Sequence, residues 1–206
     1  MMFNPALSLI EFSSIAVGIE TADAMVKRAP IEVIRAGTVQ PGKYLVLIGG
    51  LTADVEESLA AGRQVGGPAI VDIVYLPQVH RDLVEALQGG RVPDLRDALG
   101  VVETTSVAAA IQAADAGLKA ANVSLVEVRL ADGLGGKGIV LYSGVVADVE
   151  IAIVRERYAA AAGERLAVRR FDIEEPSLGV SLSLTLDPPA TVWHFPMSHV
   201  KTPLVQ

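Results

Sequence analysis

The feature that most constrains this chain is an internal repeat. Residues 9–34 align with residues 101–126 at a constant offset of 92, and a second segment starting at Gly50 continues the match at an offset of 94. Two residues are therefore inserted in the second copy, near residues 131–138. Matches that stay in phase across two segments predict two copies of one folding unit. The identical pairs include Glu11 and Glu103, Ser14 and Ser106, Asp23 and Asp115, Lys27 and Lys119, and Gly50 and Gly144.

Each copy has the pattern of a strand, a helix, two strands, a helix and a strand. In the first copy residues 6–12 are apolar and extended, and apolar residues at three- and four-residue steps then predict a helix that Ser13 or Ser14 can cap. A hairpin, a second helix and a strand over residues 70–76 complete the copy. This order predicts an α+β fold of ferredoxin-like type, in which an antiparallel sheet carries its helices on one face.

The repeat divides the chain into three parts. The first domain is expected at residues 6–88 and the second at 98–175, joined by a linker that contains glycine and proline. A C-terminal extension at 176–206 has no counterpart in the first copy. Its alternating apolar residues from Leu178 to Leu186 predict one strand. That strand either joins the sheet of its own chain or pairs with a neighbouring subunit or cargo, and the sequence leaves both open.

The apolar composition indicates contact with other protein. Hydrophobic residues make up 51% of the 206-residue chain and aromatic residues only 4%, which suits close packing of small elements better than a large aromatic-lined pocket. The mean hydropathy of +0.44 is high for a soluble monomer. No apolar run approaches the roughly 20 residues that span a bilayer. The excess apolar surface is therefore expected to meet protein rather than lipid.

Charge and residue types argue against several functions. The formal net charge of −7 argues against a nucleic-acid partner, because a phosphate backbone needs a basic face. The absence of cysteine removes disulfides, thiol catalysis and cysteine-bound iron–sulfur clusters. The N-terminal residues lack the pattern of a secretion signal, which favours a cytoplasmic protein.

The candidate catalytic and metal-binding residues are few. His194 and His199 are too few and too poorly spaced to hold a metal ion, and no catalytic constellation emerges, so we expect no enzymatic activity, cofactor or metal. His80 is expected to cap or pack near the last helix of the first copy. Glu11 and Glu103 lie at matching strand positions, which indicates a structural task performed twice rather than one catalytic acid.

A glycine-rich segment at residues 133–138 is open to three interpretations. It does not have the spacing of a phosphate-binding loop, and a strand rather than a helix follows it, so nucleotide binding is disfavoured. A plain hairpin is a second interpretation. The repeat supplies a third interpretation, in which this segment has the same role as the turn at residues 40–42 of the first copy, with which it aligns.

The repeated residues resemble the bacterial microcompartment (BMC) shell domain. The resemblance covers about residues 6–170 and implies a tandem-domain shell protein of the unpermuted class. Such a chain is expected to trimerise into a single-layer pseudohexameric tile with a central pore. The residues that carry the resemblance are Leu9-Ile10-Glu11, Asp23-Ala24-Met25-Val26-Lys27, Gly49-Gly50 and Asp54-Val55-Glu56, with Val101-Val102-Glu103 and Asp115-Ala116-Gly117-Leu118-Lys119 in the second copy.

The resemblance also implies site residues. Lys27 and Lys119 correspond to lysines at the edge between adjacent tiles, with Asp23 and Asp115 four residues before them. Gln78 occupies an edge position where the family commonly has arginine. A local alternative exists for the lysines, since an acid–lysine pair at this spacing stabilises an exposed helix by about 0.2–0.5 kcal/mol. The residues expected to line the pore are Gln40, Pro41, Gly42, Gly133, Leu134, Gly135 and Gly136.

The partners implied by the resemblance are other copies of the chain, hexameric and pentameric shell proteins, and small metabolites that cross the pore. No nucleic acid and no membrane are expected, and the location is the microcompartment shell in the bacterial cytoplasm. Two alternatives stay open: a trimeric ligand-binding or sensory protein of ferredoxin-like fold, and an enzyme with a site at the junction of the repeats.

Overall fold

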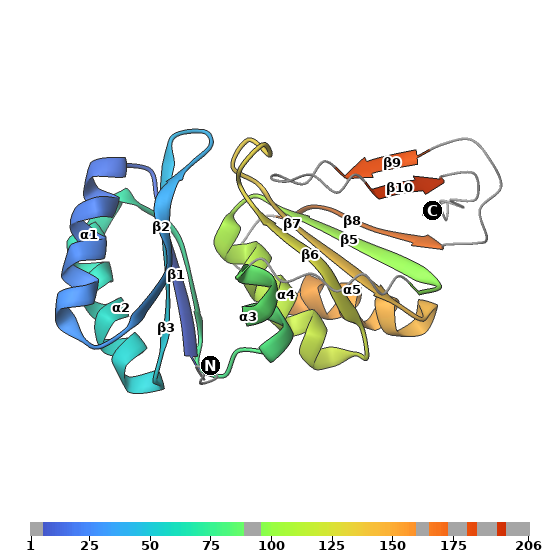
Figure 1. The fold of residues 1–206 in the computed structure, drawn as a ribbon, viewed down its shortest axis with the longest axis horizontal. Helices are drawn as coiled ribbons and strands as arrows, with labels where there is room; N and C mark the ends of the chain where they lie inside the picture. Colours follow the sequence, from blue (N-terminus) through green and yellow to red (C-terminus); the bar gives the residue numbers. More distant parts are fainter. Residues whose placement is uncertain (1–5, 89–95, 160–164, 173–180, 185–192, 197–206) are drawn as a thin grey trace.

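Two copies of one α+β unit lie side by side (Figure 1). The computed structural model describes residues 6–88, 96–159, 165–172, 181–184 and 193–196. The first copy consists of β1 (Ala6–Phe12), α1 (Ile15–Arg28), β2 (Glu32–Val39), β3 (Lys43–Gly50), α2 (Thr52–Gly66), the short helix η1 (Gly67–Ala69) and β4 (Ile70–Leu76), and α3 (Arg81–Leu87) follows it. The second consists of β5 (Ala98–Thr104), α4 (Val107–Ala120), β6 (Ser124–Leu130), β7 (Gly138–Gly144), α5 (Val146–Ala159) and β8 (Arg165–Asp172).

The two sheets have the same topology. Their strand orders are β2-β3-β1-β4 and β6-β7-β5-β8, and the neighbouring strands in both are antiparallel. The registers also correspond, because Leu9 lies opposite Leu47 in one sheet and Val101 opposite Leu141 in the other. The predicted ferredoxin-like fold and the unpermuted order of elements are confirmed. The inserted residues lie in the connection between β6 and β7.

Helix boundaries follow from local capping. The hydroxyl of Ser14 accepts a hydrogen bond from the Val17 amide, and the hydroxyl of Ser106 accepts one from the Ala109 amide, so equivalent serines cap α1 and α4. His80 caps α3, since its Nδ1 accepts from the amide of Asp82 at 3.3 Å. This confirms the structural role expected of His80.

Strand β1 is buried along its whole length, because both faces of the first sheet are covered at its centre. Its apolar sequence is interrupted only by Ser8 and Glu11. Ile10 and Phe12 pack beneath α1 and α2, in a core that also contains Met25 and Val55. The alternate residues, such as Leu9, point to the other face and belong to a core shared with the second copy. The two copies are therefore joined by a continuous apolar interior.

The described part of the C-terminal extension contains two short strands, β9 (Ser181–Leu184) and β10 (Trp193–Pro196). They pair with each other in a separate two-stranded sheet. β9 falls within the segment whose alternation predicts a strand, and the rest of that segment lies outside the described residues. None of the helices that the structure describes is long and apolar enough to cross a membrane.

Replacement of Phe12 by alanine should destabilise the fold strongly. Phe12 is 0% exposed, and removal of a buried aromatic ring costs about 3–5 kcal/mol. Val71 is 46% exposed, so Val71→Ala should change the free energy of unfolding by no more than about 0.5 kcal/mol. Chemical denaturation of both variants measures the difference. Similar losses in the two variants would contradict the assignment of the core.

Candidate functional site

The two copies meet where α4 covers the free face of the first sheet, against β1 and β4. The apolar stripe of α4 is fully or almost fully buried there: Val107 and Ile111 are 0% exposed and Leu118 is 6% exposed. Leu9 and Val74 of the first sheet belong to the same cluster. This junction is a packed apolar interface between two domains of one chain, because both domains bury apolar side chains in it.

A buried carboxylate connects the two copies. Glu11 is 0% exposed, and its Oε1 lies 2.5 Å from Nζ of Lys43. Its Oε2 accepts a hydrogen bond from the Val107 amide at 2.9 Å, at the first residue of α4. The first amides of a helix lack intrahelical partners and carry partial positive charge, so a carboxylate is well placed there. Glu11 therefore has the structural role expected from its repeat position.

A second acidic side chain strengthens the same contact. Oδ2 of Asp72 on β4 accepts a hydrogen bond from the hydroxyl of Ser106, which itself caps α4. Two carboxylates of the first sheet thus hold the N-terminus of a helix in the second copy. This pair could not be predicted from the sequence, because nothing in the local pattern relates a residue of β4 to a serine 34 positions later.

The predicted tile-edge residues fall into two groups. Asp115 is only 5% exposed, and its Oδ1 accepts from the amide of His80 at 2.8 Å. Lys119 donates both to Asp115 and to the carbonyl of Gln78, so these three residues take part in the junction between the copies. Asp23 and Lys27 instead form an exposed pair on α1, with side chains 59% and 72% accessible. The equivalent residues therefore have different surroundings.

The two predicted pore loops lie next to each other at one end of the sheets (Figure 1). A Cβ atom built on Gly136 would lie 2.8 Å from Cδ of Pro41 and 3.4 Å from the carbonyl oxygen of Gln40. An ion pair of 2.6 Å between Arg35 and Asp132 also connects the two hairpins. Gly136 is buried and Leu134 half-buried, while the other five predicted residues are exposed. The structure thus brings all seven together.

The longer loop depends on its glycines. Gly133, Gly135 and Gly136 have φ values of +72°, +62° and +88°, a region that disfavours residues with a Cβ atom. Two turns follow one another, since the Leu134 amide donates to the Ala131 carbonyl and the Lys137 amide donates to the Leu134 carbonyl. The backbone rather than side chains therefore forms most of the loop tip. Strand β7 follows directly, without the helix that a phosphate-binding loop requires.

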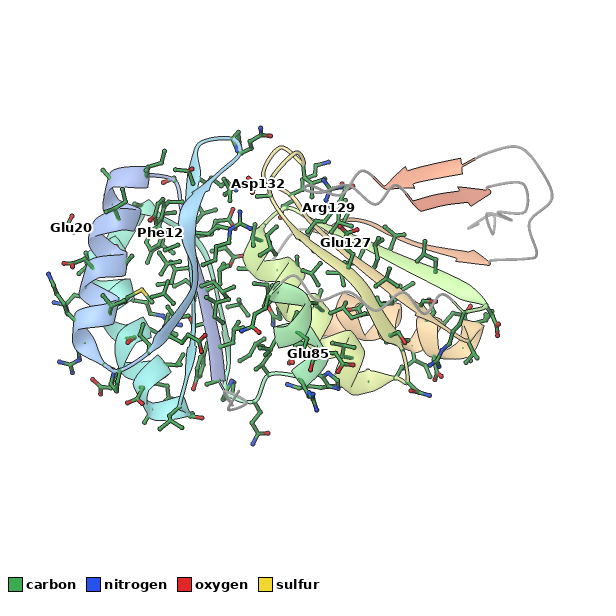
Figure 2. All side chains as sticks on the ribbon, viewed as in Figure 1. Phe12, Glu20, Glu85, Glu127, Arg129 and Asp132 are labelled. Carbon is green, nitrogen blue, oxygen red and sulfur yellow. The ribbon has the colours of Figure 1, made fainter. Side chains whose placement is uncertain are left out.

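Charges lie behind the loop tips in acid–base pairs. Figure 2 shows Asp132, Glu127 and Arg129 gathered near the hairpin between β6 and β7. Each basic side chain around the two loops has an acidic partner, and so the loop ends present little net charge. The pairs are Arg35 with Asp132 at 2.6 Å, Lys43 with Glu11 at 2.5 Å, Lys137 with Glu103 at 2.9 Å, and Arg129 with Glu127 at 3.9 Å.

These features define a class of protein. The chain is a tandem pair of ferredoxin-like domains that dock sheet against helix and bring two loops together at one end. Among the described residues, no group of three or more His, Asp or Glu side chains is arranged to hold a metal ion.

The comparison with known families identifies the family. The BMC domain matches residues 6–79 and again residues 98–176, so both copies are covered. The bacterial microcompartment shell protein PduT of Citrobacter freundii is 41% identical over 174 residues, which are 84% of this chain and 94% of the relative. The chain therefore belongs to the BMC-domain family, and it is a structural shell protein of a bacterial microcompartment.

Solved structures agree with this assignment. A crystal structure of a microcompartment protein from Desulfitobacterium hafniense DCB is 38% identical, with a TM-score of 0.73, and the match covers 82% of this chain and 94% of that one. The fused permuted hexameric shell protein MSM0275 from the RMM microcompartment shares the fold at 23% identity, with a TM-score of 0.57 over 78% of this chain and 83% of that one. Nothing in these similarities favours the alternative of a ligand-binding or sensory protein.

Replacement of Glu11 by alanine should weaken the junction between the copies. The change leaves Lys43, whose side chain is 21% exposed, without its carboxylate, and it removes the acceptor of the Val107 amide. Breaking a buried pair in this way costs about 3–5 kcal/mol. In the control, Glu85→Ala removes an exposed pair with Arg81 and should cost no more than about 0.5 kcal/mol. Equal denaturation midpoints for the two variants would show that Glu11 does not support the junction.

Proposed function

We propose that three copies of this chain close into a pseudohexameric tile, which joins other shell proteins in the bacterial cytoplasm and passes small metabolites through a central pore, without catalysing a reaction. One observation carries the proposal. Helix α1 leaves exposed the same apolar positions that its repeat counterpart α4 buries against a sheet.

The comparison between α1 and α4 is direct because the two helices align residue by residue at the offset of 92. In the second copy three apolar positions of the helix are buried in the junction, whereas in the first copy all three are exposed. Their exposed fractions are 39%, 54% and 44% for Ile15, Ile19 and Val26, against 0%, 0% and 6% for Val107, Ile111 and Leu118. The strand that follows shows the same difference, since Val33 of β2 is 41% exposed and Leu125 of β6 is 1% exposed. An exposed apolar stripe of this kind favours a protein partner.

The second sheet supplies a matching surface. Glu103 pairs with Lys137 as Glu11 pairs with Lys43, but the Glu103 side chain is 30% exposed, whereas that of Glu11 is fully buried. Val101, the counterpart of the buried Leu9, is only half-buried. In the proposed ring α1 of one chain docks on the second sheet of the next chain. Glu103 then accepts a hydrogen bond from the Ile15 amide of the docked helix, as Glu11 accepts one from the Val107 amide within the chain. Head-to-tail contacts of one kind form a closed ring when the rotation from one subunit to the next divides a full turn evenly. Three chains of two domains each then give a ring of six similar domains.

Replacement of Ile19 by aspartate tests the ring. A carboxylate at a buried interface position opposes association, because its desolvation is not offset by a partner. The parent should be a trimer by light scattering coupled to size exclusion, and Ile19→Asp should be a folded monomer with an unchanged far-ultraviolet spectrum.

Glu20→Ala serves as the matched control, since Glu20 is the exposed neighbour of Ile19 and points away from the domain in Figure 2. That variant should stay trimeric. A parent that is monomeric at micromolar concentration, or an Ile19→Asp variant that still forms trimers, would rule out the proposed ring.

The pore of the proposed tile is lined by loops of two kinds in alternation. Three copies of Gln40-Pro41-Gly42 alternate with three copies of the longer glycine loop around the threefold axis. Because the loop tips are uncharged and the charges behind them are paired, the parent pore is expected to discriminate weakly by charge. Gly135 cannot be used to introduce a charge without strain, since its φ is +62°.

Gln40→Glu tests the pore with little change in size. Gln40 is exposed, and the substitution adds three carboxylates around the proposed axis. Close like charges repel an entering anion, so flux of a small anionic metabolite into assembled shells should fall several-fold, while flux of a neutral solute of similar size stays at the parental value. Unchanged anion flux with intact trimers would show that Gln40 lies away from the route.

Lys27 is the proposed edge lysine that can be tested most cleanly. Its side chain is 72% exposed and its only close ionic contact among the described residues is with Asp23 on the same helix. Lys119 already donates to Gln78 and Asp115, and so a change at Lys119 also disturbs the junction within the chain.

A further inference from the structure

The end of each sheet opposite the pore loops carries an exposed apolar residue in both copies. β3 and β7 each run from a pore loop to this end, about 25 Å away at the usual strand rise. Leu51 follows β3 directly, and Val145 follows β7 at the equivalent repeat position. Leu51 is 65% exposed, which is the highest value among the large apolar residues that the structure describes, and Val145 is 44% exposed. We call Leu51 and Val145 the rim pair.

Both residues of the rim pair occupy the N-cap of a helix. The carbonyl of Leu51 accepts from the amide of Val55 at 3.0 Å at the start of α2, and the carbonyl of Val145 accepts from the amide of Val149 at 3.0 Å at the start of α5. Leu51 makes no side-chain capping hydrogen bond. Leucine and valine are among the poorest N-cap residues, whereas serine, threonine, asparagine and aspartate are preferred.

The same chain caps its other long helices in the preferred way. Ser14 and Ser106 cap α1 and α4 at equivalent positions of the two copies. Two apolar N-caps at a second pair of equivalent positions therefore break the local rule twice, at exposed sites where a polar residue would stabilise the helix. Such breaks between local preference and sequence are typical of functional surfaces.

The charges at this end of the molecule are already paired within the chain. Lys27 pairs with Asp23, and Arg28 pairs with Glu57 at 2.5 Å. Lys119 pairs with Asp115 at 2.5 Å. Ion pairs between tiles would first have to break these pairs, and exposed ion pairs contribute little. An apolar contact at the rim has no such competition.

We propose that Leu51 and Val145 form the apolar contact between neighbouring tiles, and that the partner is a second copy of the same trimer. The proposal rests on the proposed trimer, in which the rim pair places one apolar residue on each of the six sides. When two tiles meet edge to edge through a twofold axis, the same rim surface lies on both sides, so an apolar residue meets an apolar residue. Because both repeats carry one, every side of a tile can make this contact.

The double variant Leu51→Ser with Val145→Ser separates this role from a role in folding. Serine is a better N-cap, so the midpoint of thermal unfolding should stay equal or rise. Loss of the apolar contact should raise the protein concentration at which the purified trimers form sheets by about ten-fold or more, as followed by light scattering and electron microscopy. The fold is thus expected to keep or gain stability while sheet formation becomes weaker, a combination that a purely structural residue would not produce.

Val71→Ser is the matched control. Val71 is 46% exposed and lies at the opposite end of β4, next to Ile70, which pairs with Phe12 near the pore loops. It should form sheets at the parental concentration. Size exclusion with light scattering is run on every variant, so that a change of sheet formation is read only from intact trimers.

The outcomes distinguish the two proposals. A trimeric double variant that forms sheets at the parental concentration overturns the role of the rim pair and leaves the proposed trimer standing. A parent that is not trimeric overturns the proposed function and this inference with it. Parental trimers that form no sheets alone, but bind a different shell protein through Leu51 and Val145, overturn the choice of a second copy as the partner.

Discussion

The arrangement of the two copies depends on the ion pair and the hydrogen bond that the buried carboxylate of Glu11 makes. A fully buried charge is tolerated only where it is paired, and here its two oxygens bind Lys43 in one copy and the first amide of α4 in the other. Since the sheet and the helix are both rigid elements, these bonds and the apolar stripe of α4 fix the angle between the copies. The adjacency of the two loops, supported by Arg35 and Asp132, follows from that angle.

Duplication has also allowed the two kinds of junction to differ. Asp72, which lies opposite Glu11 and binds Ser106, has Ala167 as its counterpart opposite Glu103. Arg35, which lies opposite Leu47, has Glu127 as its counterpart opposite Leu141. The contact between chains in the proposed ring therefore lacks one carboxylate that the contact within the chain possesses. A single-domain subunit repeated six times could not divide its contacts in this way.

The sequence predicted the elements better than the contacts between them. The limits of β1 and β4, the serine caps and the cap at His80 follow from local patterns, and the repeat predicted the equivalence of Glu11 and Glu103. The pair of Arg35 and Asp132, 97 residues apart, depends on how the copies dock, which no local pattern encodes. The burial of Asp115 has the same cause, because its repeat partner Asp23 is exposed.

The covalent connection between the copies has a kinetic consequence. Tethering two partners by a short linker holds them at an effective concentration of about millimolar order, so the junction around Glu11 forms within one molecule and independently of protein concentration. In the proposed ring only the contacts between chains then require collision. A protomer thus meets its neighbours with its two domains already fixed at one angle, and three of the six interfaces of the proposed ring form without any dependence on dilution.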